Sequence, residues 1–300
     1  MAHYNCTELS MTGGNGVHRV AAMTNAEIIP TRRITTVRLA TLLTVIIITV
    51  SSTGARQAVP RSRLRIGLIT PSVESASAAS VARGVRLGAA EAQQTAKLVG
   101  DDVELYEASA SADAGAVAAA TRLSSSRQVH VLIGTSANDA DALSRFAESR
   151  GILFFNVASR ASALRAACRR HTFHLEVAST GNGSDTLLLW NPTLERFGAA
   201  QINDRYRRKY GIPMDGQAWA GWAAAKIASE AALRAHSTNP AKLLAYLESP
   251  EGRFDGHKGI PLTFGAADHQ LRQPLYSRDA NEIQDRASDS PPATCRSSKR

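Results

Sequence analysis

Residues 129–159, VHVLIGTSANDADALSRFAESRGILFFNVAS, constrain the fold more than any other stretch of the chain. Two short apolar runs rich in β-branched and aromatic residues, VHVLIG and ILFFNV, flank a segment whose apolar residues repeat with helical spacing. Two strands joined by a helix are expected to be parallel neighbours, because a parallel pair needs a crossover connection. The segment therefore predicts a βαβ unit at the centre of a parallel sheet.

The residues before this unit continue the same alternation. Strands are predicted at 64–70 and 103–106, and helices at 75–99 and 112–123. Together with the central unit they predict half of a doubly wound α/β sheet. Gly84 and Gly88 lie four residues apart on the first helix, and small residues at this spacing are expected to let the helix lie close on the sheet.

The C-terminal half is predicted to be mainly helical. Helices are expected at 194–210, where Gly211 ends the helix, at 219–236, and at 241–247, where Asn239-Pro240 starts it. Trp219 and Trp222 are expected to anchor the core. Residues 252–276 are expected to form a loop and a hairpin, with strands at 262–264 and 275–276.

Composition favours a globular protein without a nucleic-acid partner. The 300 residues are 44% hydrophobic, which is far from a disordered composition. Lys and Arg number 35 against 26 Asp and Glu, a net charge of +9, but the basic residues fall in scattered clusters. No platform of aromatic and basic residues and no zinc-ligand spacing accompanies them, so the charge predicts solvated faces or a targeting signal and no metal site.

The first 55 residues are predicted to be an N-terminal extension and a secretory signal. Arg32 and Arg33 precede the apolar run 39–50, and Thr53-x-Ala55 follows it. This order is typical of a signal peptide, with cleavage expected after Ala55 and a periplasmic location for the mature protein. The apolar run is short for a membrane span, and an uncleaved anchor is the alternative.

Several segments together resemble one known family. They are IGLITP, ARGVRLGAAEA, the central segment, LRAACRRHTFHLEVAS, WAGWAAAKIASEAALRA, AKLLAYLES and FDGHKGIPLTFGAADHQLRQPLY. In these the chain resembles the type I periplasmic solute-binding proteins of ABC importers, the leucine/isoleucine/valine-binding family. GIPLTF and QLRQP are most similar to the subgroup that accompanies PQQ-dependent alcohol dehydrogenase systems.

The resemblance implies a non-enzymatic, exported solute-binding component of an importer. Its partners would be a small polar, amino-acid-like solute and the membrane subunits of the ABC importer, and it would need no cofactor. The alternative is a periplasmic accessory protein that meets a component of a quinoprotein alcohol dehydrogenase system and has no transport role.

The resemblance also implies a set of binding positions. In this family, backbone and hydroxyl groups in the turns after the first-lobe strands hold the solute. The matching positions are Ser72 after strand 64–70, then Thr135, Ser136 and Ala137 after the VHVLIG strand, then Asn156, Ala158 and Ser159 after the ILFFNV strand. Free N–H groups at a helix N-terminus, with a Ser hydroxyl, suit a carboxylate. The alternative is that Ser136 and Asp139 only form a capping box for a helix beginning near Asn138.

Enzymatic alternatives have little support in the sequence. GTSAN places Ser136 between a strand and a helix, as in a nucleophile elbow, but Asn138 replaces the second Gly of that motif. The loop PSVESAS lacks the glycines of a dinucleotide site. The four histidines that could supply a base, His171, His174, His257 and His269, are expected to be surface or packing residues.

The chain departs from the family after the first lobe. Type I binding proteins have two lobes, and the second needs several βαβ units of about thirty residues each. Only about a dozen residues separate Ala178 from Trp190, with turn chemistry at Gly181-Asn182-Gly183 and one surviving strand expected at 187–190. The predicted organisation is a signal region (1–55), a first α/β lobe (56–178), a truncated second-lobe remnant and hinge (179–215), C-terminal helices packing on the first lobe plus a hairpin (216–276), and a polar tail (277–300).

Export changes what the three cysteines can do. Cleavage of the signal would remove Cys6 and leave Cys168 and Cys295 in an oxidising compartment. A disulfide between them is predicted, and it would tie the polar tail to the first lobe.

Overall fold

The computed structural model describes residues 62–178 and 188–276, together with the backbone of residues 283–284. All of these lie in the larger of the chain's two units, residues 56–300. The expected signal region, the turn at Gly181-Asn182-Gly183 and nearly all of the polar tail lie outside the described residues.

Five parallel strands form the central sheet, in the order β2-β1-β3-β4-β5. They are β1 (Arg63–Thr70), β2 (Asp102–Ser109), β3 (Val131–Gly134), β4 (Leu153–Asn156) and β5 (Thr172–His174). The helices between them are α1 (Ala76–Leu98), α2 (Gly115–Arg127), α3 (Ala140–Arg150) and α4 (Ser162–Ala166). The predicted doubly wound parallel sheet is confirmed. The sequence analysis missed α4 and β5, because five and three residues are too few to show a helical or strand period.

The strand register places the carboxyl ends of three neighbouring strands at one level. Gly134 of β3 pairs with Ile69 of β1 on one side and with Asn156 of β4 on the other. Asn156 pairs in turn with His174 of β5. We call this side of the sheet, with the turns that leave it, the carboxyl edge.

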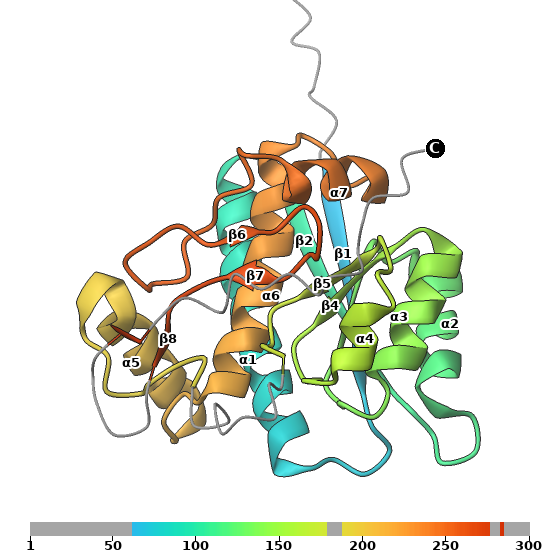
Figure 1. The fold of residues 1–300 in the computed structure, drawn as a ribbon, viewed down its shortest axis with the longest axis horizontal. Coiled ribbons are helices and arrows are strands. Elements are labelled where there is room, and N and C mark those ends of the chain that lie inside the picture. Colours follow the sequence, from blue (N-terminus) through green and yellow to red (C-terminus); the bar gives the residue numbers. More distant parts are fainter. Residues whose placement is uncertain (1–61, 179–187, 277–282, 285–300) are drawn as a thin grey trace, which may run out of the picture. The chain divides into compact units, whose positions relative to one another are not determined.

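Helices cover both faces of the sheet. α1 lies on one face with the later helix α6 (Gly216–Arg234), while α2, α3 and α4 lie on the other (Figure 1). Alternate side chains of the strands enter the two cores: Ile133 and Phe155 pack with α1 and α6, whereas Leu132 and Phe154 pack with α2 and α3. Strands buried on both faces explain why the central runs are almost entirely apolar.

The remaining helices lie beside α1 and α6. α5 (Ala199–Tyr210) follows a 3-10 turn at Arg196–Gly198 and ends at Gly211, which has a φ of 73°. α7 (Pro240–Glu248) begins after Asn239, whose side chain accepts hydrogen bonds from the N–H groups of Ala241 and Lys242. None of the helices in the described segments is long and apolar enough to cross a membrane.

The short C-terminal strands do not pair as expected. β6 (Thr263–Phe264) pairs with β7 (Leu271–Arg272), and β8 (Leu275–Tyr276) pairs with β9 (Ile283–Gln284). The expected hairpin partner at 275–276 is therefore wrong. Pro274 separates β7 from β8, and a residue without an N–H interrupts a ladder. The strand expected at 187–190 is, within the described residues, a single bridge between Leu188 and Tyr276.

The glycines of α1 contact α6, and the expectation that they contact the sheet is wrong. A Cβ atom on Gly84 would lie 1.9 Å from the Ala218 carbonyl oxygen, and one on Gly88 would lie 2.5 Å from that of Trp222. The same holds for a glycine of α6 that faces α1: a Cβ on Gly221 would lie 2.4 Å from the Val81 carbonyl oxygen. The two helices therefore pack backbone against backbone.

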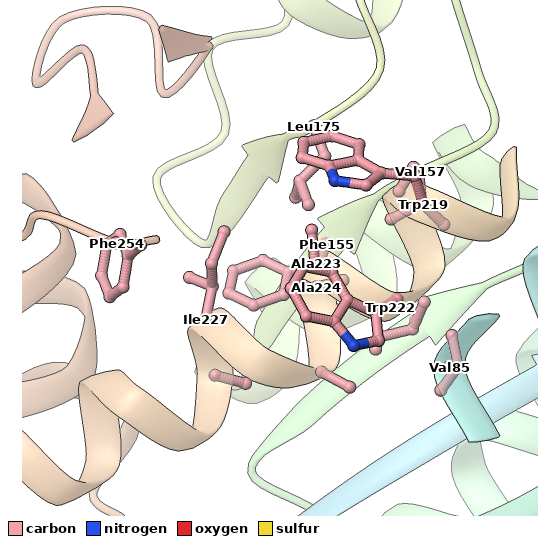
Figure 2. Close-up of a cluster of buried hydrophobic side chains, with 14 of the residues drawn as sticks. Val85, Phe155, Val157, Leu175, Trp219, Trp222, Ala223, Ala224, Ile227 and Phe254 are labelled. Carbon is pink, nitrogen blue, oxygen red and sulfur yellow. The ribbon is translucent and has the colours of Figure 1, made fainter. Parts of the chain in front are cut away.

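Trp219 and Trp222 confirm the prediction that they anchor the core. Both are fully buried, among residues such as Phe155 and Ile227 (Figure 2). Their ring N–H groups have partners: Trp219 donates to the Gly256 carbonyl at 3.1 Å and Trp222 to the Glu91 carboxylate at 2.9 Å. Satisfied ring N–H groups allow these large side chains to be buried without a polar penalty.

We predict that Gly84→Ala destabilises the protein by about 3 kcal/mol, because the new methyl group meets rigid backbone atoms of α6. Gly216→Ala is the matched control, since its Cβ would have an ordinary contact at 3.4 Å. We expect the control to change the free energy of unfolding by no more than about 1 kcal/mol. Urea denaturation of both variants measures this, and equal stabilities would show that the helices are not in close contact at Gly84.

Candidate functional site

The positions implied by the family resemblance all lie at the carboxyl edge, Asn156 as the last residue of β4 and the others in the turns, but they differ in access to solvent. Ser72 and Ala137 are exposed, Ser136 and Ala158 are half-buried, and Thr135, Asn156 and Ser159 are buried. A solute at this edge would therefore meet the turn after β3 and the outer part of the turn after β4.

The turn after β3 contains a hydroxyl group without a partner. The Thr135 N–H donates to the Ile69 carbonyl at 3.0 Å, which continues the sheet for one more residue. Its side chain is only 2% exposed, yet Oγ1 has no hydrogen-bond partner among the described residues. Ser136, the next residue, makes no side-chain hydrogen bond within the same part of the chain. Buried hydroxyl groups usually have a partner, so this turn is open to one.

The N-terminus of α3 also lacks a side-chain cap, so the capping-box alternative for Ser136 and Asp139 is wrong. Asp139 occupies the cap position with φ −88° and ψ −10°, a helical conformation, and its side chain makes no capping bond. A capping side chain needs an extended backbone at that position to reach back to the helix. The helix starts at Ala140, two residues later than expected.

The acid in the first turn of α3 does not fill this position either. The Asp141 carboxylate contacts Arg145 at 3.0 Å and Arg169 at 2.8 Å. The first N–H groups of any α-helix have no intrahelical acceptor, and the helix dipole favours an anion there. Thr135, Ser136 and the start of α3 thus carry hydrogen-bond donors of the kind that suit a carboxylate.

Asn156 and Ser159 shape the turn after β4. The Asn156 amide donates to the Ser159 carbonyl at 2.8 Å, and its oxygen accepts from the Ser159 N–H at 2.9 Å. Asn156 Nδ2 also lies 3.2 Å from His174 Nδ1, so this ring nitrogen acts as an acceptor. Both residues therefore hold the backbone of the turn, and Ala158 between them is the part nearer to solvent.

A buried polar network lies beneath this turn, and the sequence analysis did not find it. Its charged members are Arg165, Glu176 and Lys258, all less than 7% exposed. Burial raises the pKa of the Glu176 carboxyl group and lowers that of the Arg165 guanidinium to about 10. No pattern in the sequence marks these residues, because each one is isolated in an otherwise ordinary segment.

Lys258 is the most deeply buried member. Its ammonium donates to Gln273 Oε1 at 2.7 Å and to the Pro274 carbonyl at 3.0 Å, and it lies 3.7 Å from the centre of the Trp219 ring. Burial lowers the pKa of this amine well below its usual value. Gln273 in turn donates to the Leu175 carbonyl at 2.8 Å, so the amine links three distant segments.

The histidines that could have supplied a catalytic base have other partners. His171 contacts Glu148 and His269 contacts Glu248, both at 2.9 Å, while His257 lies 3.2 Å from the Phe197 carbonyl. In the described segments none of them, nor His174, hydrogen-bonds to Ser136, and no group of acidic, Cys or His residues there could hold a metal ion.

The sheet order is that of an open parallel α/β fold, in which ligands bind where parallel strands end. Comparison with known proteins shows what the chain is similar to. A model of the periplasmic binding protein family matches residues 63–191. A search of curated protein sequences finds no match.

Solved structures of the same fold include a leucine-binding protein from Thermotoga maritima, with a TM-score of 0.59 and 14% identity over 75% of this chain and 99% of that one. A branched-chain amino acid transporter binding protein from Streptococcus pneumoniae, in complex with isoleucine, has a TM-score of 0.57 and 14% identity, with 75% and 99% covered. An ABC-transporter solute-binding protein from R. palustris, in complex with benzoate, has a TM-score of 0.56 and 15% identity over 72% of this chain and 92% of that one. The resemblance to leucine/isoleucine/valine-binding proteins and the type I fold are confirmed; the PQQ-associated subgroup stays a prediction.

Cys168 lies directly after α4, at an exposed position, and is disulfide-bonded. The other two cysteines, Cys6 and Cys295, lie outside the described residues. We predict that Cys295 is the partner, because export and signal cleavage would remove Cys6. Peptide mapping of the exported protein without reductant should yield one fragment containing Cys168 and Cys295. Recovery of Cys295 as a free thiol would contradict this pairing.

His174 predicts a loss of stability in mild acid. Burial, together with the charges of Arg165 and His269, keeps its pKa well below 6.5, so the folded protein holds it neutral while the unfolded chain binds a proton. The unfolded state therefore gains stability as the pH falls through 6.5. Relative to His174→Gln, the wild type should lose about 1.4 kcal/mol between about pH 7.5 and about pH 5.5. Urea titrations of both proteins measure the difference, and parallel pH profiles would contradict it.

Proposed function

We propose that this chain is the exported solute-binding component of an ABC importer and binds a small carboxylate-bearing, amino-acid-like solute at the turn after β3. The observation that carries the proposal is the buried, unpartnered Thr135 hydroxyl beside the uncapped start of α3. The family match over residues 63–191 and the fold supply independent support.

The chemistry of this turn favours an anion over a neutral solute. A carboxylate would accept hydrogen bonds from the Thr135 and Ser136 hydroxyl groups and from the first backbone N–H groups of α3. Such bonds to an ionised acceptor are about twice as strong as those between neutral groups. The rest of the solute would lie over the turn after β4, near Ala158.

We propose further that binding is weak. The residue count between Ala178 and Trp190 leaves no room for a second lobe, so the solute would remain largely in water on one side. Tight small-molecule sites bury most of the ligand, and a half-covered carboxylate is expected to bind with Kd of about 1 mM. Millimolar leucine should then raise the melting temperature only slightly.

The partners proposed are the importer's membrane subunits, with the N-terminal 55 residues acting as the export signal. The apolar run 39–50 and the small residues before Arg56 support export to the periplasm. Fractionation of cells that produce the full chain, with N-terminal sequencing of the periplasmic form, tests whether the N-terminal 55 residues direct export and are removed. A chain that starts at Arg56 is expected, and retention in the cytoplasm would contradict export.

NMR titration tests the carboxylate site even at millimolar affinity. Leucine and benzoate are the probes, because similar folds are known with isoleucine and with benzoate. Leucinol and benzamide are matched controls that lack the negative charge. We expect amide shifts confined to residues 135–140 and 157–159 with the acids and none with the controls. Equal shifts with benzamide and benzoate would show that the site does not select a carboxylate.

Thr135→Val should separate binding from stability. Removing an unpaired buried hydroxyl should raise the free energy of unfolding by about 1 kcal/mol, whereas affinity for leucine or benzoate should fall about tenfold. Thr121→Val is the control, because the Thr121 hydroxyl already donates to the Val117 carbonyl at 2.8 Å. Denaturation and NMR titration of both variants measure the two effects. A Thr135→Val protein that binds as well as the wild type would contradict the proposed role.

A further inference from the structure

Arg165 is an almost fully buried cation that binds the backbone of the turn after β4. Its Nη1 donates to the Ser159 carbonyl at 3.3 Å and to the Ala161 carbonyl at 3.2 Å. These two carbonyl groups belong to the turn that carries Ala158, one of the positions implied to contact a solute. The side chain is 6% exposed, so these bonds are shielded from water and are stronger than they would be at the surface.

The same guanidinium reaches two other segments. Its Nη2 donates to the Glu176 carbonyl beyond β5, and its Nε donates to Gln270 Oε1 at 3.0 Å. Gln270 comes from the C-terminal hairpin, 105 residues later in the chain. Its amide donates to the carbonyl groups of His174 at 3.1 Å and of Glu176 at 3.2 Å. One planar side chain therefore ties the turn, the segment after β5 and the hairpin together.

The hydrogen bonds of Arg165 named above fix the relative positions of three segments. Their acceptors are backbone carbonyl groups and one side-chain amide oxygen, from the turn after β4, the segment after β5 and the hairpin. Arginine suits this position because its planar guanidinium holds several N–H donors in a fixed arrangement. Lysine would donate from a single nitrogen and could not reach both the turn and the hairpin.

We propose that Arg165, held by Gln270, is a positioning residue that fixes the turn 157–161 in its solute-binding conformation. Its contribution is preorganisation, because a turn that is already ordered loses no conformational entropy when the solute binds. The role in binding rests on the proposed function, whereas the ordering of the turn can be measured without any solute.

Hydrogen–deuterium exchange on the exported protein tests the ordering. In Arg165→Ala, the amides of residues 157–161 and 175–177 should exchange faster, while β1 and α6 should keep wild-type protection. The Ser159 N–H is a specific reporter, because it is bonded at 2.9 Å to Asn156. Millimolar guanidinium, far below denaturing levels, should restore protection by filling the vacated site. In Arg165→Lys the lysine side chain occupies the site, so added guanidinium should not restore protection of residues 157–161.

Arg169→Ala is the matched control. Arg169 lies four residues later and is also largely covered, but it contacts Ser144 at 3.1 Å and Asp141 at 2.8 Å instead of the turn. Its removal should leave residues 157–161 protected. If Arg165→Ala fails to fold, Gln270→Ala keeps the guanidinium and should loosen the same residues to a smaller degree.

The outcomes separate the two proposals. Local loss of protection with guanidinium rescue supports positioning, and unchanged exchange or a uniform loss that guanidinium does not reverse overturns it. Where leucine or benzoate binds the wild type, Arg165→Ala should weaken binding about tenfold, again with rescue, and unchanged affinity would overturn the role in binding. If neither acid binds the wild type, the proposed function fails, and the exchange data still decide whether Arg165 orders the turn.

Discussion

The backbone contact between α1 and α6 is the constraint on which the rest of the structure depends. Gly84 and Gly88 on one helix and Gly221 on the other lie where the backbones of the two helices approach most closely, with no Cβ atom to keep them apart. The helices are therefore close enough for Trp219 and Trp222 to reach the core beneath them. Because α6 comes more than a hundred residues after α1, this contact attaches the C-terminal half of the described chain to the N-terminal sheet.

This attachment has a consequence for the candidate site. The hairpin that follows α7 is carried to the β5 side of the sheet, where the His174 N–H donates to the His269 carbonyl at 2.8 Å and His174 bridges to Gln270. β5 is the outermost strand on its side of the sheet, and without the hairpin its outer backbone groups would be unpaired. The hairpin thus covers β5 and supplies Gln270. Gln270 binds Arg165, which in turn binds the turn after β4.

The sequence was sufficient for the elements but insufficient for their contacts. Apolar periodicity located the first four strands and the long helices, because long runs with a single period are unambiguous. It predicted the wrong partner for Gly84, since a stripe of small residues shows that something lies close without showing what. It missed β5, which has three residues, and gave 275–276 the wrong strand partner because pairing depends on tertiary contacts.

The candidate site was predictable in outline for a similar reason. Neighbouring parallel strands end at the same edge of a sheet, so the sequence alone predicts that the turns after β3 and β4 lie together. Which of these side chains have hydrogen-bond partners could not be predicted from the sequence. Asn156 is the last residue of β4 and Ser136 follows β3 by two residues, yet the Asn156 side chain is bonded within the turn after β4 and Ser136 has no side-chain bond in the described chain. That difference arises from the backbone path of each turn, which residue type alone does not encode.

The described residues include two kinds of buried polar group, and the contrast between them bears on function. Arg165 and Lys258 donate hydrogen bonds to acceptors on distant segments and so join those segments. The Thr135 hydroxyl is neutral and has no hydrogen-bond partner among the residues that the structure describes. An unpaired buried hydroxyl lowers stability by about 1 kcal/mol or more, and a solute that supplies the missing acceptor regains this free energy on binding. Under the proposed function, the Thr135 hydroxyl would favour the bound state, and Arg165 would hold the turn after β4 in the conformation that binding needs.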